Sequence, residues 1–389
     1  MKNFTYYNPT TIHFGRDQEK NVGKIIKSYG FSRVLIHYGQ GSVIRSGLLD
    51  TVRQSLIEQA ITFIEIGGVQ PNPEISLIRE VLPQLKNEKI DLVLALGGGS
   101  VIDSAKLIAH GYFYNGDPFD FSLHKTKPTK ALPVGVILTI SAAGSESSTS
   151  SVISDEFNHI KIGFNSDTNR PLFAIENPEL TYSVSPTQTA AGIVDMMMHT
   201  IERYFNPSEE FELSDAIAEG LLHSIVGAGL KVMEEPNNYQ ARANLMLGSS
   251  LAHNGLTSLG KPSSMPVHLL EHALGGLYPR VTHGVGLAVL FPAWAKQYYQ
   301  IDQAKFARFA RRVFDVQEPD DEKAAFAGIV ALENFYHKLG MPNNLKTFGV
   351  TEEALPLIVN HLFSDCDVIK HHLKPLDRNL ALKIFRAAY

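Results

Sequence analysis

The sequence predicts an α/β domain built on a parallel, Rossmann-like sheet, followed by an all-helical domain. Up to about residue 175, short apolar runs alternate with glycine-rich turns and amphipathic stretches, as in a parallel sheet covered by helices. From about residue 185, apolar residues recur at helical spacing almost throughout. A chain of 389 residues is also long for a single hydrophobic core, which favours two domains.

Composition narrows the class of protein. Hydrophobic residues make up 44% of the chain and charged residues 19%, as in ordinary globular enzymes. The net charge of −5 gives no reason to expect nucleic acid or an anionic membrane as a partner, and we find no apolar run of transmembrane length. With Cys366 as the single cysteine, we expect no disulfide framework, no thiolate metal site and a cytoplasmic location.

The strands of the first domain are expected where apolar runs are bounded by turn residues. An extended segment at residues 3–14 precedes a predicted helix at residues 18–29. The buried strands that follow are expected at Arg33–His37, Ile61–Ile66, Asp91–Leu96, Leu132–Thr139 and Leu172–Ile175.

The turn after the first buried strand bears on cofactor choice. Enzymes that select NAD place a carboxylate there to accept the ribose 2′-OH. Residues 38–42 read Tyr-Gly-Gln-Gly-Ser, with Arg45 three residues on and no acid before Asp50. Gly41 and Ser42 can donate hydrogen bonds to a 2′-phosphate and Arg45 adds charge, although Gln40 could serve either ribose. We therefore expect NADP(H) to be preferred over NAD(H); the alternative is a surface turn without a cofactor role.

The turn after the strand at Asp91–Leu96 is the strongest phosphate signal. Gly97-Gly98-Gly99-Ser100 opens a helix, where glycines let a ligand approach the backbone and the first helical turn offers unpaired N–H groups. A tight turn without a ligand is the alternative, and the spaced G-x-G-x-x-G pattern is absent. The polar stretch Ser141–Thr149, after the next strand, is either a surface loop or a wall of the cofactor site.

The second domain begins with a helix-start signature, in which Ser185 is followed by Pro186 and, three residues on, by Gln188. We therefore expect a dinucleotide-binding α/β domain at residues 1–185 and a helical metal-binding domain at residues 186–389, with the ligand site in the cleft between them. Further helices are expected near residues 211–233, 238–256, 264–274, 285–300, 303–313, 321–339, 351–362 and 378–388.

Candidate metal ligands occur only in this second domain. Asp195 and His199 stand four residues apart on one helix face. There they can bind one divalent cation together, or they can hydrogen-bond to each other without a metal. His268 and His272 form a second such pair, and His283 follows. Each histidine taken singly is better explained as a core residue, but one carboxylate and several histidines together indicate a metal site.

These motifs resemble the iron-containing (group III) alcohol dehydrogenases, closest to the branch of butanol dehydrogenases and NADPH-dependent broad-range aldehyde reductases. The resemblance covers essentially the whole chain, with Ala143 standing where the family usually has threonine. The motifs that carry it are Gly97-Gly98-Gly99-Ser100-x-x-Asp103-x-x-Lys106, Gly144-Ser145-Glu146, Asp195-x-x-x-His199-x-x-Glu202, His268-x-x-x-His272 and His283-Gly284.

The resemblance implies one divalent metal, Fe²⁺ or Zn²⁺, bound by Asp195, His199, His268 and His283. It implies that His272 lies near the substrate and nicotinamide and is not a ligand. We expect His272 and Asp103 to be catalytic, with His272 relaying the alcohol proton. The alternatives are that water carries this proton, or that His272 lines the site without a proton role. Family members commonly form homodimers or larger homo-oligomers. The residues expected to contact the cofactor are Gly39, Gly41, Ser42, Asn72, Gly98, Gly99, Ser100, Asp103, Thr139, Ser145 and Lys161.

The expected reaction is hydride transfer between NADP(H) and a small aliphatic alcohol or aldehyde, with the metal as a Lewis acid. An NAD-dependent polyol (glycerol-type) dehydrogenase is one alternative, but such enzymes usually have fewer metal ligands. A dehydroquinate synthase-like lyase would need a basic cluster, whereas Lys261 and Arg280 are the only cations expected near the ligands. A non-catalytic dinucleotide-binding or metal-storage protein would bind the cofactor without turnover.

Overall fold

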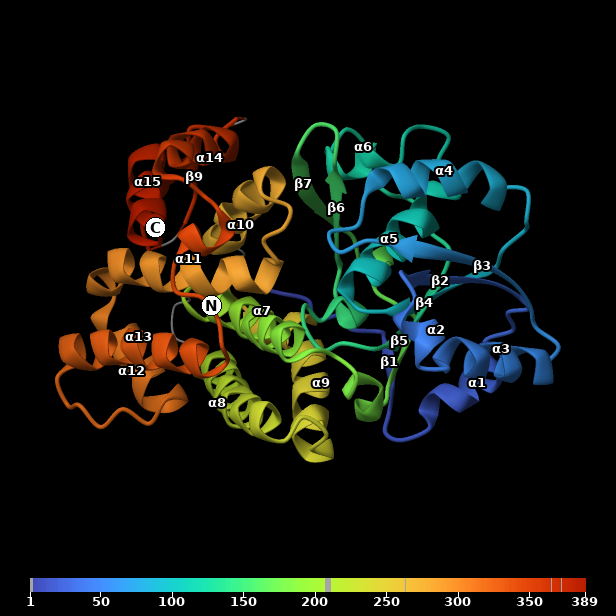
Figure 1. Ribbon diagram of the computed structural model, residues 1–389, viewed down its shortest axis with the longest axis horizontal. Helices are drawn as coiled ribbons and strands as arrows, with labels where there is room; N and C mark the ends of the chain where they lie inside the picture. Colours follow the sequence, from blue (N-terminus) through green and yellow to red (C-terminus); the bar gives the residue numbers. More distant parts are fainter. Residues whose placement is uncertain (1–2, 207–210, 263, 365, 372) are drawn as a thin grey trace. The chain divides into compact units, whose positions relative to one another are not determined.

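The computed structural model describes residues 3–206, 211–262, 264–364, 366–371 and 373–389. The chain divides into two compact units, one formed by Tyr7–Ser183 and the other by Val184–Tyr389 together with the segment that precedes Tyr7 (Figure 1). The first unit contains a six-stranded sheet and the second is mostly helical. The predicted fold class, an α/β region followed by a helical region, is confirmed.

The six strands form one sheet in the order β1-β8-β5-β4-β2-β3, and every neighbouring pair is parallel. The five predicted buried strands all form, with bounds that differ by no more than three residues. The strands are β1 (Thr11–Phe14), β2 (Arg33–Gly39), β3 (Thr62–Val69), β4 (Leu92–Gly97), β5 (Val134–Leu138) and β8 (Phe173–Glu176).

Helices cover both faces of this sheet, with α1, α2 and α3 on one side and α4 and α5 on the other (Figure 1). Strand β4 is buried along its whole length, which explains why it is a continuous apolar run. The helical elements of this unit are η1 (Gln18–Asn21), α1 (Val22–Ser28), α2 (Ser42–Arg45), α3 (Leu48–Glu58), α4 (Ile75–Leu85), α5 (Gly99–Gly111), α6 (Phe119–Ser122), η2 (Ser145–Ser147), η3 (Asp167–Asn169) and η4 (Pro178–Thr181).

A hairpin that the sequence analysis did not predict follows the loop after β5. Strands β6 (Ser150–Asp155) and β7 (Ile160–Asn165) pair antiparallel as a separate two-stranded sheet. Residues alternate between buried and partly exposed along β6, so the period-two signal of a half-buried strand was present but short. Residues 144–148, just before the hairpin, are buried, and the surface-loop interpretation of this stretch is therefore wrong.

The helical unit is organised around α7 (Pro186–Tyr204), which contacts α8, α9 and α11. The side chain of Ser185 caps α7 by accepting a hydrogen bond from the amide of Gln188 at 3.2 Å, as predicted. Every residue from Thr189 to Glu202 is buried. Because α7 is surrounded by core, each polar side chain on it must find a partner inside the protein.

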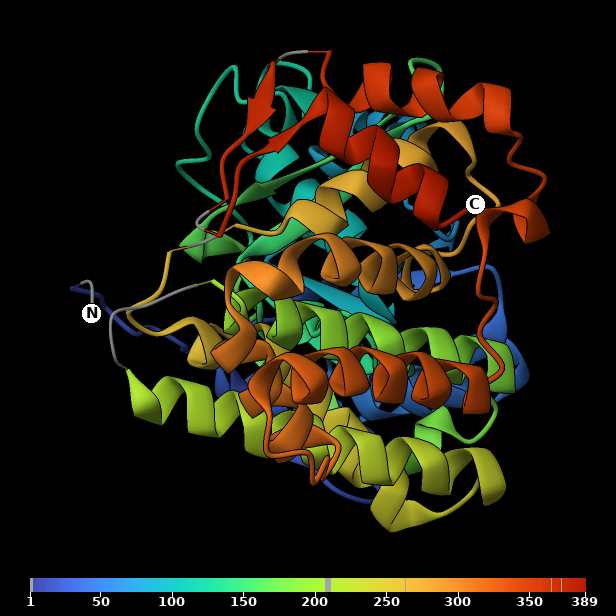
Figure 2. The same cartoon turned by 90° about the vertical axis from the view of Figure 1, so that its left-hand side faces the viewer.

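The other predicted helices form within four residues of their expected bounds. Figure 2 turns this unit toward the viewer, with the red C-terminal helices α14 and α15 beside each other. The remaining elements are α8 (Glu212–Glu234), α9 (Tyr239–His253), η5 (Leu256–Ser258), α10 (Pro266–Leu277), α11 (His283–Tyr298), η6 (Tyr299–Ile301), α12 (Gln303–Val313), α13 (Asp321–Lys338), η7 (Leu345–Phe348), η8 (Glu352–Ala354), α14 (Leu355–Leu362), β9 (Val368–Ile369), β10 (Leu376–Asp377) and α15 (Arg378–Ala387).

Among the described residues, α8 is the one helix long and apolar enough to cross a membrane, judged by length and composition alone. The core helix of a globular protein passes the same test. Leu222 and Ile225 of α8 lie in the hydrophobic core of the helical unit. The same helix carries Asp215 and Glu219, both largely buried and ion-paired.

Candidate functional site

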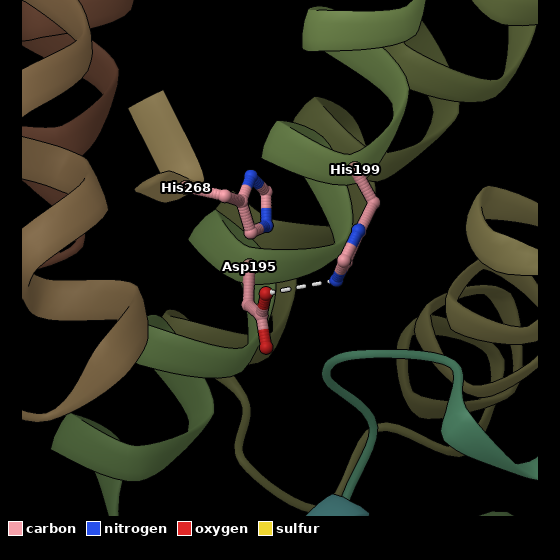
Figure 3. A group of neighbouring side chains, drawn as sticks. All are labelled: Asp195, His199 and His268. Atoms are coloured by element: carbon pink, nitrogen blue, oxygen red, sulfur yellow. Dashed lines mark ion pairs between the residues drawn. The ribbon is translucent and has the colours of Figure 1, made fainter. Parts of the chain in front are cut away.

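Helix α7 and helix α10 bring together three candidate metal ligands. Asp195 and His199 are each 6% exposed, and the Nε2 atom of His199 lies 3.4 Å from Oδ1 of Asp195. His268 enters from the first turn of α10 and faces the same space (Figure 3). The candidate ligand atoms of these three residues all lie within 4.8 Å of one another. Residues predicted from two separate stretches of sequence therefore meet at one point.

The carboxylate of Glu202 orients His268. One oxygen accepts a hydrogen bond from the amide of Val267 at 2.7 Å, and the other accepts from the amide of His268 at 3.1 Å and also pairs with Nδ1 of His268. If Nδ1 carries the proton, as this pairing favours, Nε2 carries the lone pair. That Nε2 is buried and has no hydrogen-bond partner within the described part of the chain. A buried lone pair of this kind fits a metal ligand.

His283, the first residue of α11, has a matching arrangement. Its Nδ1 pairs with Glu271, whose side chain is fully buried, and its Nε2 lies 3.7 Å from Oδ1 of Asp195. Gly284 makes this approach possible, because a Cβ atom there would lie 2.0 Å from the carbonyl oxygen of Ala191 on α7. The four residues predicted as ligands therefore converge from three helices, with two of the histidines oriented by carboxylates.

His272 lies one helical turn beyond His268 on α10 and is partly exposed. The ring centroids of His272 and His283 are 5.5 Å apart. Together with Glu271 and His283 it forms a second group of potential ligand atoms within 4.8 Å of one another. This group is not independent of the first, because His283 belongs to both and its Nδ1 already pairs with Glu271.

Burial sets the charge state of His199. It lowers the pKa of the imidazole well below the ordinary value of 6.5, and the neighbouring His253 and His268 lower it further. The ring is therefore neutral near pH 7. A neutral imidazole can offer a lone pair to a cation, whereas the imidazolium cannot.

Sequence reasoning missed two residues of this region and gave Glu202 no role. Glu271 lies between His268 and His272 in a His-x-x-Glu-His pattern, which was an available signal. His253, the last residue of α9, stacks on His199 with ring centroids 3.8 Å apart and an interplanar angle of 26°. Its sequence position is unrelated to the other histidines by any helical spacing, so no local signal could have found it.

Most of the candidate cofactor residues lie in the sheet unit, at or just after the carboxyl ends of β2, β3, β4 and β5. The chain passes from β2 to β3 on one side and then to β4 on the other side of β2. The strand order therefore reverses between β2 and β4, and in open α/β sheets ligands bind at such a switch point. The two turns predicted to hold the cofactor, Gly39–Ser42 and Gly97–Ser100, follow these two strands.

Contacts between the turns support this grouping. A Cβ atom on Gly39 would lie 3.8 Å from a methyl group of Val101, in the first turn of α5. The amide of Thr139, which follows β5, donates to the carbonyl oxygen of Gly97 at 3.1 Å. A Cβ atom on Gly98 would lie 2.1 Å from Ile140, so only glycine fits there. The predicted residues Gly41, Ser42, Gly99, Ser100 and Asn72 belong to the turns at the same edge, after β2, β4 and β3.

Asp103 and Ser145 are linked directly. The hydroxyl of Ser145 donates to Oδ1 of Asp103 at 2.5 Å, while Oδ2 of Asp103 accepts from the amide of Val152 at 2.9 Å. These contacts attach the buried loop and β6 to α5, whereas the predicted catalytic role of Asp103 stays a prediction. Lys161 lies on β7, opposite Ser154, and is partly exposed.

Lys106 strengthens the same attachment from inside. Its fully buried ammonium donates to the backbone oxygens of Ser145 and Ser150, each at 2.7 Å, and to the Ser145 hydroxyl at 2.8 Å. Burial lowers its pKa to about 8. Three donors thus meet three close acceptors, and the loop after β5 is held in one place.

Comparisons with known proteins agree with both halves of the chain. Residues 9–178 match the family model for iron-containing alcohol dehydrogenase, and residues 189–389 match the model for the C-terminal region of the same family. The chain is 39% identical over 391 residues to NADH-dependent butanol dehydrogenase A of Clostridium acetobutylicum, covering 100% of both chains. It is 35% identical over 365 residues to the NADPH-dependent aldehyde reductase YqhD of Escherichia coli, covering 92% of each. Its structure is similar to that of NADH-dependent butanol dehydrogenase A from Thermotoga maritima, with a TM-score of 0.95, 37% identity and coverage of 100% of this chain and 99% of that one.

Proposed function

The chain belongs to the iron-containing alcohol dehydrogenase family, and we propose that it transfers a hydride between NADP(H) and a small aliphatic alcohol or aldehyde. The family makes it an oxidoreductase that uses a nicotinamide cofactor and a metal. The preference for NADP(H), the substrate and the identity of the metal belong to the proposal. The observation that carries it is the convergence of Asp195 with His199, His268 and His283.

We propose that these four side chains bind one divalent ion, Fe²⁺ or Zn²⁺. Three imidazoles and one carboxylate suit either ion. Glu202 and Glu271 hold His268 and His283 with Nδ1 protonated, which leaves each Nε2 as the donor atom. When bound, the ion supplies Lewis-acid chemistry to the substrate oxygen.

His272 is the proposed carrier of the alcohol proton. Its ring is partly exposed, unlike the buried ring of His268 one turn earlier, so it can exchange a proton with water. Water acting alone is the rival route. The competing possibility is that His272 lines the site without a proton role, and the two are separated by its effect on rate at constant metal content.

We propose that residues 1–185 bind the dinucleotide and residues 186–389 the metal. Relatives include both NADH- and NADPH-dependent enzymes, so the cofactor preference has to come from this chain's own residues. The guanidinium of Arg45 would lie 3.4 Å from a Cβ atom on Gly41, which puts a cation beside the turn after β2. We also propose that the protein is cytoplasmic and forms a homodimer or a larger homo-oligomer.

The surroundings of the site argue against a lyase that binds a phosphorylated substrate. The ammonium of Lys261 is buried and donates to Asp215 at 2.5 Å, so this cation is already paired. Arg280 is exposed. Of the apolar residues near the ligands, Leu269 is 40% exposed. The others are buried in the core and do not form a wall of the substrate site: Met196, Met197, Met198, Leu270 and Leu274.

An activity screen tests the proposal. The purified protein is assayed for bound metal, loaded separately with Fe²⁺ and Zn²⁺, and offered small aliphatic aldehydes with NADPH or NADH. We expect turnover of butanal and related aldehydes only with metal. Cofactor binding without turnover of any aldehyde or alcohol would indicate a non-catalytic protein. Oxidation of glycerol with NAD⁺ and no reduction of aldehydes would indicate a polyol dehydrogenase.

A further inference from the structure

His199 differs from the other two candidate histidine ligands in how its ring is held. The rings of His268 and His283 are each fixed by a carboxylate at Nδ1. The Nδ1 of His199 is buried and has no hydrogen-bond partner within the described residues. Hydrogen bonding at this nitrogen therefore does not set the rotation of the ring about its Cβ–Cγ bond.

A stacking contact is available instead. The ring of His253 lies nearly parallel to that of His199, with centroids 3.8 Å apart and an interplanar angle of 26°. His268 meets the His199 ring less closely, at 4.5 Å and 37°. His253 belongs to neither ligand group found among the described residues. It therefore contacts a candidate ligand from outside both groups.

The backbone that carries His253 is fixed to the same part of α7. The guanidinium of Arg203 donates to the carbonyl oxygen of His199 and, at 2.9 Å, to that of Ala252, the residue before His253. The end of α9 is thus tied to the His199 turn through the main chain, so His253 is held where it can stack.

We propose that His253 is a positioning residue, which orients the ring of His199 toward the metal by stacking on it. It performs for His199 the task that Glu202 and Glu271 perform for the other two histidines. The inference rests on metal binding as set out under the proposed function. Removing the stacked ring should weaken metal binding about threefold to tenfold, the range expected for one aromatic pair.

Two substitutions test the inference. His253→Leu removes the planar ring at similar volume, and His253→Phe keeps a planar ring but no nitrogen. The dissociation constant for Co²⁺ or Zn²⁺ is measured by competition with a chelator, and the visible absorption of the Co²⁺-loaded protein reports ligand geometry. We expect His253→Leu to weaken binding and alter the spectrum, and His253→Phe to restore both. Thermal unfolding of the metal-free proteins measures general packing effects.

The outcomes separate the inference about His253 from the proposed metal site. Parental affinity and spectrum in His253→Leu would overturn the inference while leaving the metal site intact. A His253→Phe protein as weak as His253→Leu would also overturn it, because the ring nitrogens and not the stacking would then matter. A parent protein that binds neither Co²⁺ nor Zn²⁺ would refute the proposed metal site itself.

Discussion

One carboxylate oxygen of Glu202 on α7 serves two nitrogens of His268 on α10, the backbone amide at 3.1 Å and the ring Nδ1. The other oxygen accepts from the amide of Val267 at 2.7 Å. Glu202 therefore caps the first turn of α10 and fixes the tautomer of the histidine in that turn. Helix packing and the geometry of the candidate metal site depend on the same side chain.

The first prediction concerns this double role. Glu202→Gln keeps the size of the side chain but replaces one acceptor oxygen by an NH₂ group, which cannot accept. We expect metal affinity to fall about tenfold to hundredfold, as for other losses of a carboxylate behind a metal-bound histidine. The free energy of unfolding of the metal-free protein should fall by roughly 1–3 kcal/mol, because a buried donor loses its partner. Chelator competition and denaturant unfolding measure the two effects.

Glu271→Gln is the matched control, because Glu271 pairs with His283 in the same way. Glu271→Gln should weaken metal binding similarly, because it replaces the carboxylate behind a second candidate ligand. If Glu202→Gln binds metal as the parent does, Glu202 does not set the His268 donor atom.

The local parts of the candidate site could be predicted from the sequence. Asp195, His199 and Glu202 fall on one face of α7 because the helical repeat brings residues four and seven positions apart together. The buried strands could be predicted for a similar reason, since strands covered on both faces are continuous apolar runs.

The parts set by tertiary packing could not be predicted this way. The approach of His283 to Asp195 depends on Gly284 meeting the backbone of α7 at Ala191, a contact between residues far apart in sequence. The contact of His253 with His199 depends on how α9 ends beside α7. In the sheet unit, the Lys106 ammonium hydrogen-bonds to the buried loop after β5, whereas the polar residues of this stretch left a surface loop and a wall of the cofactor site equally open.

The second prediction separates ligand from proton carrier on α10. His268→Ala should lose metal and activity together, because it removes a donor atom, while the helical fold is kept. His272→Ala should keep its metal and lose about 10²-fold or more in kcat, the usual contribution of a positioned acid–base group. Elemental analysis, circular dichroism and steady-state kinetics distinguish them. Unchanged metal content in His268→Ala would show that the ligand assignment is wrong.

The third prediction concerns the diphosphate site at the start of α5. A Cβ atom on Gly99 would meet Ala143 at 3.6 Å, an ordinary contact, whereas one on Gly98 would lie 2.1 Å from Ile140, so Gly99 is the position to change. The branched side chain would keep the diphosphate from the first-turn amides. We expect the KM for the cofactor to rise about tenfold or more, because hydrogen bonds to charged groups contribute roughly 1.5–3 kcal/mol. Metal content should not change. Parental cofactor affinity would exclude this turn as the diphosphate site.

The fourth prediction concerns acid stability and His37. This histidine is fully buried in β2, with Nδ1 3.0 Å from the Ile66 carbonyl oxygen and Nε2 2.9 Å from the Ser104 hydroxyl. Burial lowers its pKa from 6.5 to about 4. Between these values the unfolded chain takes up a proton that the folded protein does not, so stability is lost as pH falls from about 6.5 to about 4. At roughly 1.4 kcal/mol per pKa unit, the loss is about 3 kcal/mol.

Replacing His37 by glutamine tests that assignment. His37→Gln keeps a side-chain donor but cannot titrate, so its unfolding free energy should fall less steeply over the same pH window. His110, whose pKa is also lowered by burial, is present in both proteins, and its contribution cancels in the difference. Parallel pH profiles for the two proteins would mean that His37 does not carry the effect.

The last prediction concerns cofactor choice at the turn after β2. Gly39 is the position to change, because a Cβ atom there would meet Val69 at 3.6 Å and Val101 at 3.8 Å, both ordinary contacts, and its φ lies outside the left-handed region. Gly39→Asp would place a carboxylate where enzymes that select NAD use one. Repulsion of the 2′-phosphate should lower kcat/KM for NADPH relative to NADH about tenfold or more. Arg45→Gln should weaken the binding of NADPH and leave the binding of NADH unchanged, because it removes a positive charge without adding a negative one. With butanal as substrate, a parent protein that favours NADH would overturn the NADP(H) proposal, and an unaltered ratio in both variants would mean that this turn does not contact the ribose.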